Sequence, residues 1–232
     1  AGRLLLLICS VVAFRSAALL RVVDEVEVYF GCGCFWHVQH GFATLEISSL
    51  HRTDGNISSR TAYAGGREPA GGLVCYHDGN AATDYGSLGN AEAVAMTVPR
   101  GSFAEFAGRF WELCPGGARN DPQDQGGEYR SVIGLPGGIR SPLMKELLVK
   151  AGHTTLAEGR GSDGDTLGTN TVFVYDTANF KAHVAEAYHQ FHNDMVESYG
   201  SEYGALRKWA SKTKCAGDQS GGASGGLWSI FR

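Results

Sequence analysis

Apolar and polar residues along this chain follow two periods, one of two residues and one of about 3.6 residues. Runs with a period of two predict β-strands, and runs with apolar residues three and four positions apart predict amphipathic helices. The two kinds of run alternate, which favours an α/β or α+β domain of two packed layers. The predicted strands span 26–30, 91–98, 129–135 and 171–175, and the predicted helices begin near residues 34, 102, 141 and 180.

Three of the predicted helices carry clear signals. The first, over 34–46, has apolar residues at helical spacing from Phe35 to Leu45. The second begins with Ser102 and Glu105, which have the spacing of a capping box. The last is predicted to be long, with an apolar stripe at Phe180, Val184, Tyr188, Phe191 and Met195.

The composition bounds what this protein can be. Its 232 residues are enough for one domain with a full core, and its net charge of −4 with both signs interspersed gives no basic stripe for nucleic acid. Six cysteines are sparse for a disulfide scaffold, so we expect a few working thiols. The 33 glycines indicate many turns and long loops.

The chain divides into three predicted parts. Residues 1–24 contain an apolar run from Leu4 to Phe14, flanked by arginines, which is too short to span a bilayer and is typical of a secretory or organellar targeting segment. Without such targeting we expect a cytoplasmic protein, and we expect no stable membrane association. Residues 25–203 form the predicted catalytic domain, with Gly-rich loops over 47–90 and 115–128. Residues 204–232 form a predicted mobile tail rich in Gly and Ser.

Cys34 lies where the strand 26–30 gives way to a helix. Free backbone N–H groups and the dipole of a helix N-terminus favour an anion, so we expect a lowered thiol pKa and a reactive thiolate. Phe35 and Trp36 offer an apolar wall beside the sulfur. The alternative is that Cys34 is a buried, inert residue, which is common for a cysteine in a Gly-rich turn.

Carboxyl and hydroxyl groups provide further candidates. Glu92 shares a strand face with apolar residues, where a carboxyl should hold its proton and could act as a general acid. Alternatively, Glu92 lies at the strand end and reaches water. Asp124 and Tyr129 lie in a polar loop that enters a strand and could supply hydrogen bonds to a site, or could form an ordinary turn.

Five short motifs span residues 26–192 in a fixed order: 30–36 (FGCGCFW), 63–66 (YAGG), 89–94 (GNAEAV), 124–131 (DQGGEYRS) and 185–190 (AEAYHQ). Together they resemble the A-type peptide methionine sulfoxide reductases, which reduce the S epimer of methionine sulfoxide. The resemblance implies an α+β fold with a two-layer, ferredoxin-like core. It also implies thiol-dependent reduction of free or peptide-bound methionine sulfoxide without a cofactor, and recycling by thioredoxin or another dithiol.

The resemblance also implies roles for individual residues. Cys34 would be the nucleophile, and Phe35 and Trp36 would hold the substrate methyl group. Glu92 would donate a proton to the sulfoxide oxygen, and Asp124 and Tyr129 would complete the polar surroundings of that oxygen. Cys34 would become a sulfenic acid, which a second thiol converts to a disulfide.

The chain departs from the family pattern at four places. His37 stands where glycine is usual, and Glu128 stands where glutamine is usual. The family's second substrate tyrosine is missing from its motif, and Tyr76 and Tyr85 are the two candidates to replace it. The family's cysteine-containing tail motif is also absent. The resolving thiol is therefore expected to be Cys215, with Cys75 as the strongest alternative among Cys32, Cys75 and Cys114.

A rival interpretation is a metal-binding protein without catalysis. Two pairs of histidines have a spacing of three residues, and with a cysteine from the first motif they could form a zinc site. Solvated histidines on a helix face are the commoner explanation of such spacing, so we assign no metal. The residues concerned are His37, His40, His189, His192, Cys32 and Cys34.

Overall fold

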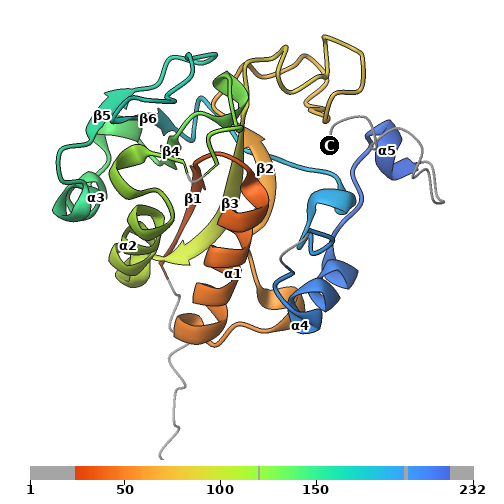
Figure 1. The fold of residues 1–232 in the computed structure, drawn as a ribbon, viewed down its shortest axis with the longest axis horizontal. Helices are drawn as coiled ribbons and strands as arrows, with labels where there is room; N and C mark the ends of the chain where they lie inside the picture. Colours follow the sequence, from red (N-terminus) through yellow and green to blue (C-terminus); the bar gives the residue numbers. More distant parts are fainter. Residues whose placement is uncertain (1–23, 120, 196–197, 220–232) are drawn as a thin grey trace, which may run out of the picture.

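The computed structural model describes residues 24–119, 121–195 and 198–219. These residues form an α+β fold built on one seven-stranded sheet, with the strand order β5-β6-β4-β1-β3-β2-β7 (Figure 1). The predicted targeting segment lies almost wholly outside the described residues, as do Cys9 and the last part of the predicted tail, 220–232.

The centre of the sheet has the ferredoxin-like topology that the resemblance implied. Strands β4, β1, β3 and β2 are neighbours in that order and pair antiparallel, with α1 connecting β1 to β2 and α2 connecting β3 to β4. In this core, Val28 of β1 pairs with Met96 of β3. The elements are β1 (Glu25–Gly31), α1 (Phe35–Leu50), β2 (Arg60–Ala64), β3 (Ala91–Pro99), α2 (Phe103–Leu113) and β4 (Val132–Leu135).

Further elements extend this core at both edges of the sheet. Strand β6 (Thr171–Asp176) pairs parallel with β4, and β5 (Thr155–Glu158), which follows α3 (Met144–Lys150), pairs parallel with β6. The short strand β7 (His183–Val184) pairs antiparallel with β2. The C-terminal part contains α4 (Ser201–Ala205) and α5 (Ala216–Gln219). The 3-10 helices are η1 (Asp54–Asn56), η2 (Arg100–Ser102), η3 (Pro115–Gly117), η4 (Gly127–Tyr129), η5 (Gly138–Arg140), η6 (Ala187–His189) and η7 (Leu206–Trp209).

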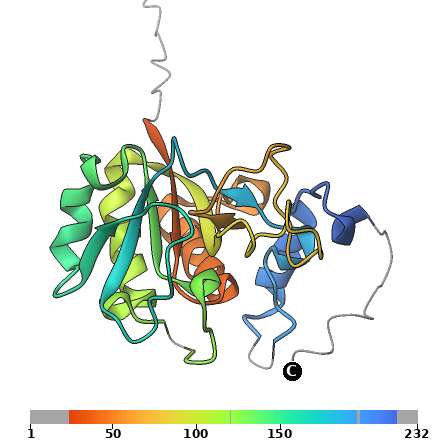
Figure 2. The same ribbon diagram turned by 90° about the horizontal axis from the view of Figure 1, so that it is seen from above.

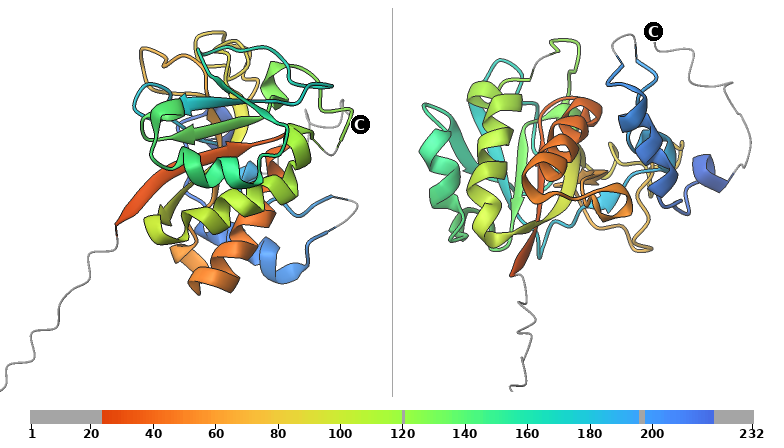
Figure 3. Two further views of the ribbon diagram at one scale, coloured as in Figure 1. Left: turned by 90° about the vertical axis from the view of Figure 1, so that its left-hand side faces the viewer. Right: turned by 90° about the horizontal axis from the view of Figure 1, so that it is seen from below.

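The three longest helices cover one face of the sheet. Figure 3 shows α1, α2 and α3 side by side beneath the strands. Alternate residues of β1 point toward these helices, and Phe30 packs its ring 5.1 Å from that of Phe42 and 5.3 Å from that of Phe110. On the other face, a second cluster with Tyr29 and Tyr175 packs against Phe180. The sheet is therefore buried on both faces near its centre.

The predicted helix over 180–195 is wrong. This segment instead forms β7, η6 and irregular chain. The side chain of Gln190 explains the difference, because its Oε1 accepts a hydrogen bond from the Thr61 N–H (3.1 Å) while its Nε2 donates to the Thr61 carbonyl (3.0 Å). These bonds, with the pairing of Val184 to β2, satisfy the backbone of the β2 edge and hold the segment beside the sheet.

Three other local predictions need correction. The strand predicted from Tyr129 begins at Val132, because residues 127–129 turn as η4. Ser102 makes no side-chain cap, and Glu105 accepts instead from the Ser49 hydroxyl. The sequence also left β2, β5 and β7 unassigned, and each of these strands is short.

The predicted mobile tail is ordered where the structure describes it. Residues 204–219 include η7 and α5, and Cys215 is buried beside the loop over residues 65–90, which contains no helix or strand. Figures 1 and 2 both show α5, in dark blue, next to this gold-coloured loop. Within the described ranges, no helix is long and apolar enough to cross a membrane.

Candidate active site

Cys34 lies at the junction of β1 and α1, as the sequence predicted. It occupies the N-cap position of α1, its side chain is partly exposed, and it is the one free cysteine among the described residues. Gly33 before it has φ +69°, and a Cβ there would lie 2.6 Å from an oxygen of Asp124. Only glycine fits this turn, because a side chain would be strained and would displace the carboxylate.

Two carboxyl groups bind the first amides of α1. The Cys34 N–H donates to Oδ2 of Asp124 (2.8 Å), and the Phe35 N–H donates to Oε2 of Glu92 (2.9 Å). The helix has no acidic residue in its own first turn, so distant segments supply both acceptors. Free N–H groups and a positive dipole end explain why carboxyl groups gather here.

The expected lowering of the Cys34 pKa is wrong. Burial raises the pKa of the thiol well above its usual value, and the nearby carboxyl groups of Glu92, Asp124 and Asp121 raise it further. A hydrogen bond from the Trp36 N–H lowers the pKa but does not offset these effects, and the first two amides of the helix donate to Asp124 and Glu92 instead of to the sulfur. The resting sulfur is therefore a neutral thiol.

Glu92 is a buried acid that holds its proton. Its side chain lies within β3, with 3% of its surface exposed. Burial raises its pKa to about 8, although the Phe35 N–H opposes the shift. The sequence placed Glu92 on an apolar face, and this burial is the reason that the carboxyl is neutral at pH 7.

The loop with Asp124 and Tyr129 packs beside Cys34. Arg119 holds this loop, because its guanidinium donates to the Asp124 carbonyl (2.5 Å) and pairs with Asp165. The Tyr129 carbonyl accepts the Gly33 N–H (3.1 Å), which joins the loop to the turn before Cys34. Burial raises the pKa of Tyr129, and so do the nearby charges of Glu92 and Cys34. Both predicted residues therefore reach the site.

The two candidate tyrosines lie together but differ in their exposure. Their rings stack with centroids 5.4 Å apart. Tyr85 is buried and donates its hydroxyl to Glu128 (3.2 Å). Tyr76 is partly exposed, and burial together with the charges of Glu92 and Cys34 raises its pKa. Tyr76 is thus the more accessible of the two, whereas Tyr85 is buried and bonded to Glu128.

Phe35 and Trp36 form the expected aromatic wall, and two histidines support it. Phe35 is buried and packs 5.3 Å from the His189 ring, while Trp36 stacks on His192 at 3.7 Å. Burial lowers the pKa of His189 to about 3, so this ring is neutral. Of the histidines that suggested a metal site, His189 and His192 are therefore aromatic packing partners here, and His40 likewise stacks on Tyr199 at 3.7 Å.

Sequence reasoning gave no role to Glu186, although it connects the tyrosines. Its carboxylate accepts from the Tyr63 hydroxyl (2.8 Å) and from the Tyr76 N–H (2.9 Å). His189 lies three residues later and packs 4.7 Å from the Tyr76 ring. The signal available in the sequence was the motif over 185–190, which the resemblance included without assigning a function.

Arg130 is a second residue whose role was missed. Its guanidinium is buried and donates to the carbonyls of Gly65 (2.9 Å), Gly89 (2.9 Å) and Gly127 (2.6 Å). It also donates to the Tyr175 hydroxyl (2.9 Å). Three motifs far apart in the sequence are thereby joined to one side chain, with its charge well solvated by carbonyl dipoles.

The cysteines differ most from expectation. Cys32 is bonded to Cys114, and Cys75 is bonded to Cys215. All four are buried, so the expectation from the composition, that these cysteines would mainly be working thiols, is wrong. Cys215, expected to resolve Cys34 from a mobile tail, is instead held in a disulfide with the alternative candidate.

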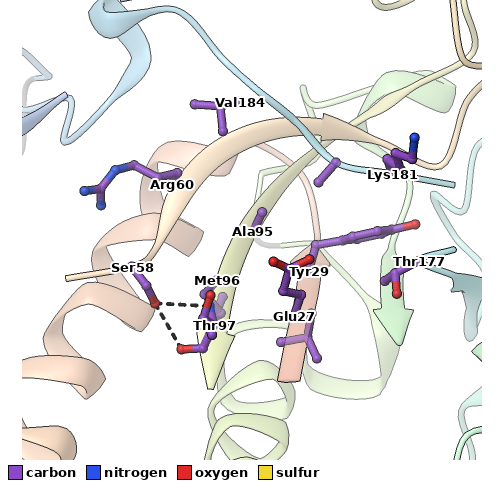
Figure 4. A pocket seen from close by; sticks show the side chains of 12 residues that line it. Glu27, Tyr29, Ser58, Arg60, Ala95, Met96, Thr97, Thr177, Lys181 and Val184 are labelled. Carbon is purple, nitrogen blue, oxygen red and sulfur yellow. Dashed lines mark hydrogen bonds between the residues drawn. The ribbon is translucent and has the colours of Figure 1, made fainter. Parts of the chain in front are cut away.

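One cavity of the described structure lies away from these residues. A cavity of about 320 Å³ opens on the sheet face opposite α1, between residues such as Tyr29, Ala95 and Lys181 (Figure 4). None of its lining residues belongs to the surroundings of Cys34 described above. We therefore define the candidate site by the reactive side chains around the α1 N-terminus, and not by this cavity.

Comparison with known proteins gives one curated relative and several solved structures. No family model matches the chain. Over 109 residues, the chain is 31% identical to the peptide methionine sulfoxide reductase MsrA of Methanothermobacter thermautotrophicus, covering 45% of this chain and 54% of the relative. It thus matches about half the length of that protein. This relative bears the name of the family that the five motifs resemble.

Two solved structures are also similar. Methionine sulfoxide reductase A of Corynebacterium diphtheriae matches with a TM-score of 0.42 and 20% identity over 72% of each chain. Reduced Mxr1 of Saccharomyces cerevisiae matches with a TM-score of 0.43 and 17% identity, over 72% of this chain and 82% of that one.

Replacing Glu92 with glutamine should stabilise the fold increasingly between pH 4.5 and pH 8. The usual pKa of the carboxyl is 4.5 and its folded pKa is about 8, so across this window the unfolded chain loses its proton while the folded protein keeps it. The wild type therefore loses stability as pH rises, and the loss stops above about pH 8. We expect a gain of about 3 to 5 kcal/mol for Glu92→Gln above pH 8, relative to its effect at pH 4.

Urea unfolding of both proteins at a series of pH values measures this difference. A difference in unfolding free energy that is the same at pH 4 and pH 9 would show that the Glu92 carboxyl is not perturbed.

Proposed function

We propose that this protein is a thiol-dependent peptide-methionine (S)-S-oxide reductase. The observation that carries the proposal is that a protonated buried carboxyl, Glu92, binds the amide next to the free thiol of Cys34. Reduction of a sulfoxide needs a nucleophile for its sulfur and a proton donor for its oxygen, and this pair supplies both. The five sequence motifs and the curated relative support the same chemistry.

In the proposed reaction, the sulfur of Cys34 attacks the sulfoxide sulfur while Glu92 protonates the oxygen. This attack forms a bond between the two sulfurs. The protonated oxygen then leaves the substrate sulfur and bonds to the sulfur of Cys34, and the sulfur–sulfur bond breaks, so methionine leaves and Cys34 is left as a sulfenic acid. The proton of the thiol replaces the one that Glu92 gives, so Glu92 ends the reaction protonated. The hydroxyl groups of Tyr76 and Tyr129 donate hydrogen bonds to the oxygen, and Asp124 orients the turn that presents Cys34.

The electrostatics of the site suit a neutral, polar substrate. Raised pKa values keep Cys34, Glu92 and both tyrosines uncharged at pH 7. A sulfoxide carries a strong dipole without net charge. Its transfer from water into the site therefore requires no desolvation of a charged group. The aromatic surface of Phe35 and Trp36 matches its methyl group. We propose that methionine-S-sulfoxide, free or peptide-bound, is the substrate and that no cofactor takes part.

Regeneration begins with a thiol from outside this chain in the proposed cycle. A dithiol protein such as thioredoxin attacks the sulfenic acid, which releases water and leaves a mixed disulfide; its second thiol then frees Cys34. This route follows from the bonding of the described cysteines, since four of the five are in buried disulfides. Cys215 could resolve Cys34 only after its own disulfide had been reduced.

Cys34→Ser should abolish reduction of the S epimer, because a hydroxyl is a poor nucleophile toward sulfoxide sulfur. Turnover of the two resolved epimers with dithiothreitol measures this, with the wild type beside it and the Cys32→Ser/Cys114→Ser protein, which lacks the neighbouring disulfide, as the control. Methionine production by Cys34→Ser at the wild-type rate would refute the proposed function.

Glu92→Gln should slow the single-turnover rate by about 10²-fold to 10⁴-fold at pH 7, as for a lost general acid. Glutamine keeps an oxygen for the Phe35 N–H, so the α1 N-terminus is preserved. The ratio of wild-type to variant rates should be constant below about pH 8 and then fall about tenfold per pH unit, as Glu92 loses its proton. Because the Glu92 charge raises the pKa of Cys34 in the wild type alone, the titration of Cys34 is measured separately in each protein by the rate of its alkylation. Equal rates for the two proteins at pH 7 would exclude Glu92 as the proton donor.

One equivalent of substrate, given without reductant, should leave Cys34 as a sulfenic acid that dimedone can trap. The physical reason is that no free thiol accompanies it among the described residues. Peptide mapping by mass spectrometry measures the adduct, and the Cys9→Ser variant controls for the cysteine outside the described ranges. Recovery of Cys34 in a disulfide with another residue of the chain would contradict the external route of regeneration.

A further inference from the structure

The Cys75–Cys215 disulfide joins two segments that both contact the candidate site. Its sulfurs are buried, with 1% and 2% of the two residues exposed, and the residues are 140 positions apart in the sequence. One end lies in the loop over 65–90, next to Tyr76. The other lies in the segment 213–219, which includes α5. The disulfide therefore connects a predicted substrate loop to the C-terminal part of the chain.

On the loop side, anchoring Cys75 anchors both tyrosines. The Cys75 N–H donates to the Thr83 carbonyl (2.8 Å), and the Tyr85 N–H donates to the Cys75 carbonyl (2.9 Å). These two bonds fix the stretch that carries Tyr85 beside the one that carries Tyr76, and the two rings stack. The rest of the loop contains no helix or strand, so its other restraints are turn hydrogen bonds and side-chain contacts, such as the bond from the Leu88 N–H to the Asp84 carbonyl (3.0 Å).

On the C-terminal side, Asp218 makes a second attachment. This buried carboxylate accepts from the backbone N–H (2.6 Å) and the hydroxyl (2.8 Å) of Thr213, which closes the segment on itself. It also accepts from the Ala187 N–H (3.0 Å). Ala187 directly follows Glu186, whose carboxylate accepts the Tyr76 N–H.

The two attachments, which are the disulfide and the hydrogen bond from Ala187 to Asp218, thus both lie near the carboxylate of Glu186. The Sγ atoms of Cys75 and Cys215 and a carboxylate oxygen of Glu186 all lie within 4.8 Å of one another. The disulfide holds the residue before Tyr76, Asp218 holds the residue after Glu186, and the hydrogen bond from Tyr76 to Glu186 closes the ring of contacts. Movement of the segment 213–219 would loosen the Tyr76 backbone from both directions.

We propose that the Cys75–Cys215 disulfide is a clamp that positions Tyr76 for substrate binding, and that Asp218 is its non-covalent half. The proposal rests on the proposed function, since it assigns Tyr76 to the sulfoxide. Ordering a long loop costs conformational entropy, and a cross-link lowers that cost before substrate arrives. Cys75 and Cys215 act through Tyr76, so they are positioning residues and do not take part in the redox chemistry of Cys34.

The test is a single turnover without reductant, so that the disulfides stay intact and Cys34 is the reacting thiol. Methionine release at a series of substrate concentrations gives a limiting rate and a half-saturating concentration. In the Cys75→Ser/Cys215→Ser protein, we expect the half-saturating concentration to rise about tenfold or more, because a displaced binding group weakens the bound geometry. The rate of Cys34 alkylation by iodoacetamide should stay at the wild-type value.

A double-mutant cycle separates positioning from general damage. In a Tyr76→Ala background, removal of the disulfide should have no further effect on the half-saturating concentration. In a Tyr129→Ala background, which is the control because Tyr129 lies in η4 and outside the loop that carries Cys75, the full effect should remain. Asp218→Ala should act in the same direction as the disulfide variant and provides the test if that variant fails to fold.

Each other result overturns the proposal. An unchanged half-saturating concentration in both clamp variants refutes it, and so does an effect that persists undiminished in the Tyr76→Ala background. Normal single turnover combined with loss of thioredoxin-driven cycling alone would assign Cys215 as a resolving thiol instead. A wild-type protein that releases no methionine would refute the proposed function itself, and the clamp's role in substrate binding with it.

Discussion

The amino terminus of α1 is the point on which the rest of this structure depends. Its first two amides donate to carboxyl groups that come from β3 and from the loop before β4. These hydrogen bonds place Glu92 and Asp124 on either side of Cys34, and each bond involves a group that the chain must bring from far away in sequence. The ferredoxin-like sheet achieves this for Glu92. Strand β3 pairs antiparallel with β1, so the start of β3, which carries Glu92, lies beside the end of β1, from which the chain turns into α1.

The same interaction decides the charge of the site. A helix N-terminus ordinarily favours an anion, and three groups compete for that stabilisation here. Asp124 and Glu92 accept the amides directly, whereas the thiol accepts neither of them, so burial dominates its pKa. The outcome is a neutral thiol beside a protonated carboxyl. Such a pair provides a nucleophilic sulfur and a proton donor without net charge. Burying neutral groups costs less desolvation free energy than burying charged ones.

Much of this arrangement could be predicted from the sequence, and the reasons differ between elements. The alternation in residues 91–98 identified β3 and the apolar face that holds Glu92, because the side-chain period of a strand is fixed by its geometry. The position of Cys34 followed from the change of period between β1 and α1. These features depend on local patterns, so the sequence contains them directly.

The features that failed depend on contacts between distant residues. The apolar stripe over 180–195 resembles a helix, but the side chain of Gln190 binds the edge of β2 and the segment forms β7, η6 and irregular chain. Disulfide partners such as Cys75 and Cys215 depend on where the tail packs, which no local pattern records. The direction of the Cys34 pKa shift likewise depends on which groups accept hydrogen bonds from the first amides of α1, and Asp124 and Glu92 come from distant parts of the chain.

The protonation state of Glu92 in the resting protein tests the central claim most directly. Difference infrared spectroscopy of the wild type against Glu92→Gln isolates the carbonyl stretch of this one carboxyl. The account predicts a band of a protonated, buried carboxylic acid at pH 6 to 7 that disappears as the pH passes about 8. A wild-type spectrum that shows only an ionised carboxylate at this position at pH 6 would contradict it.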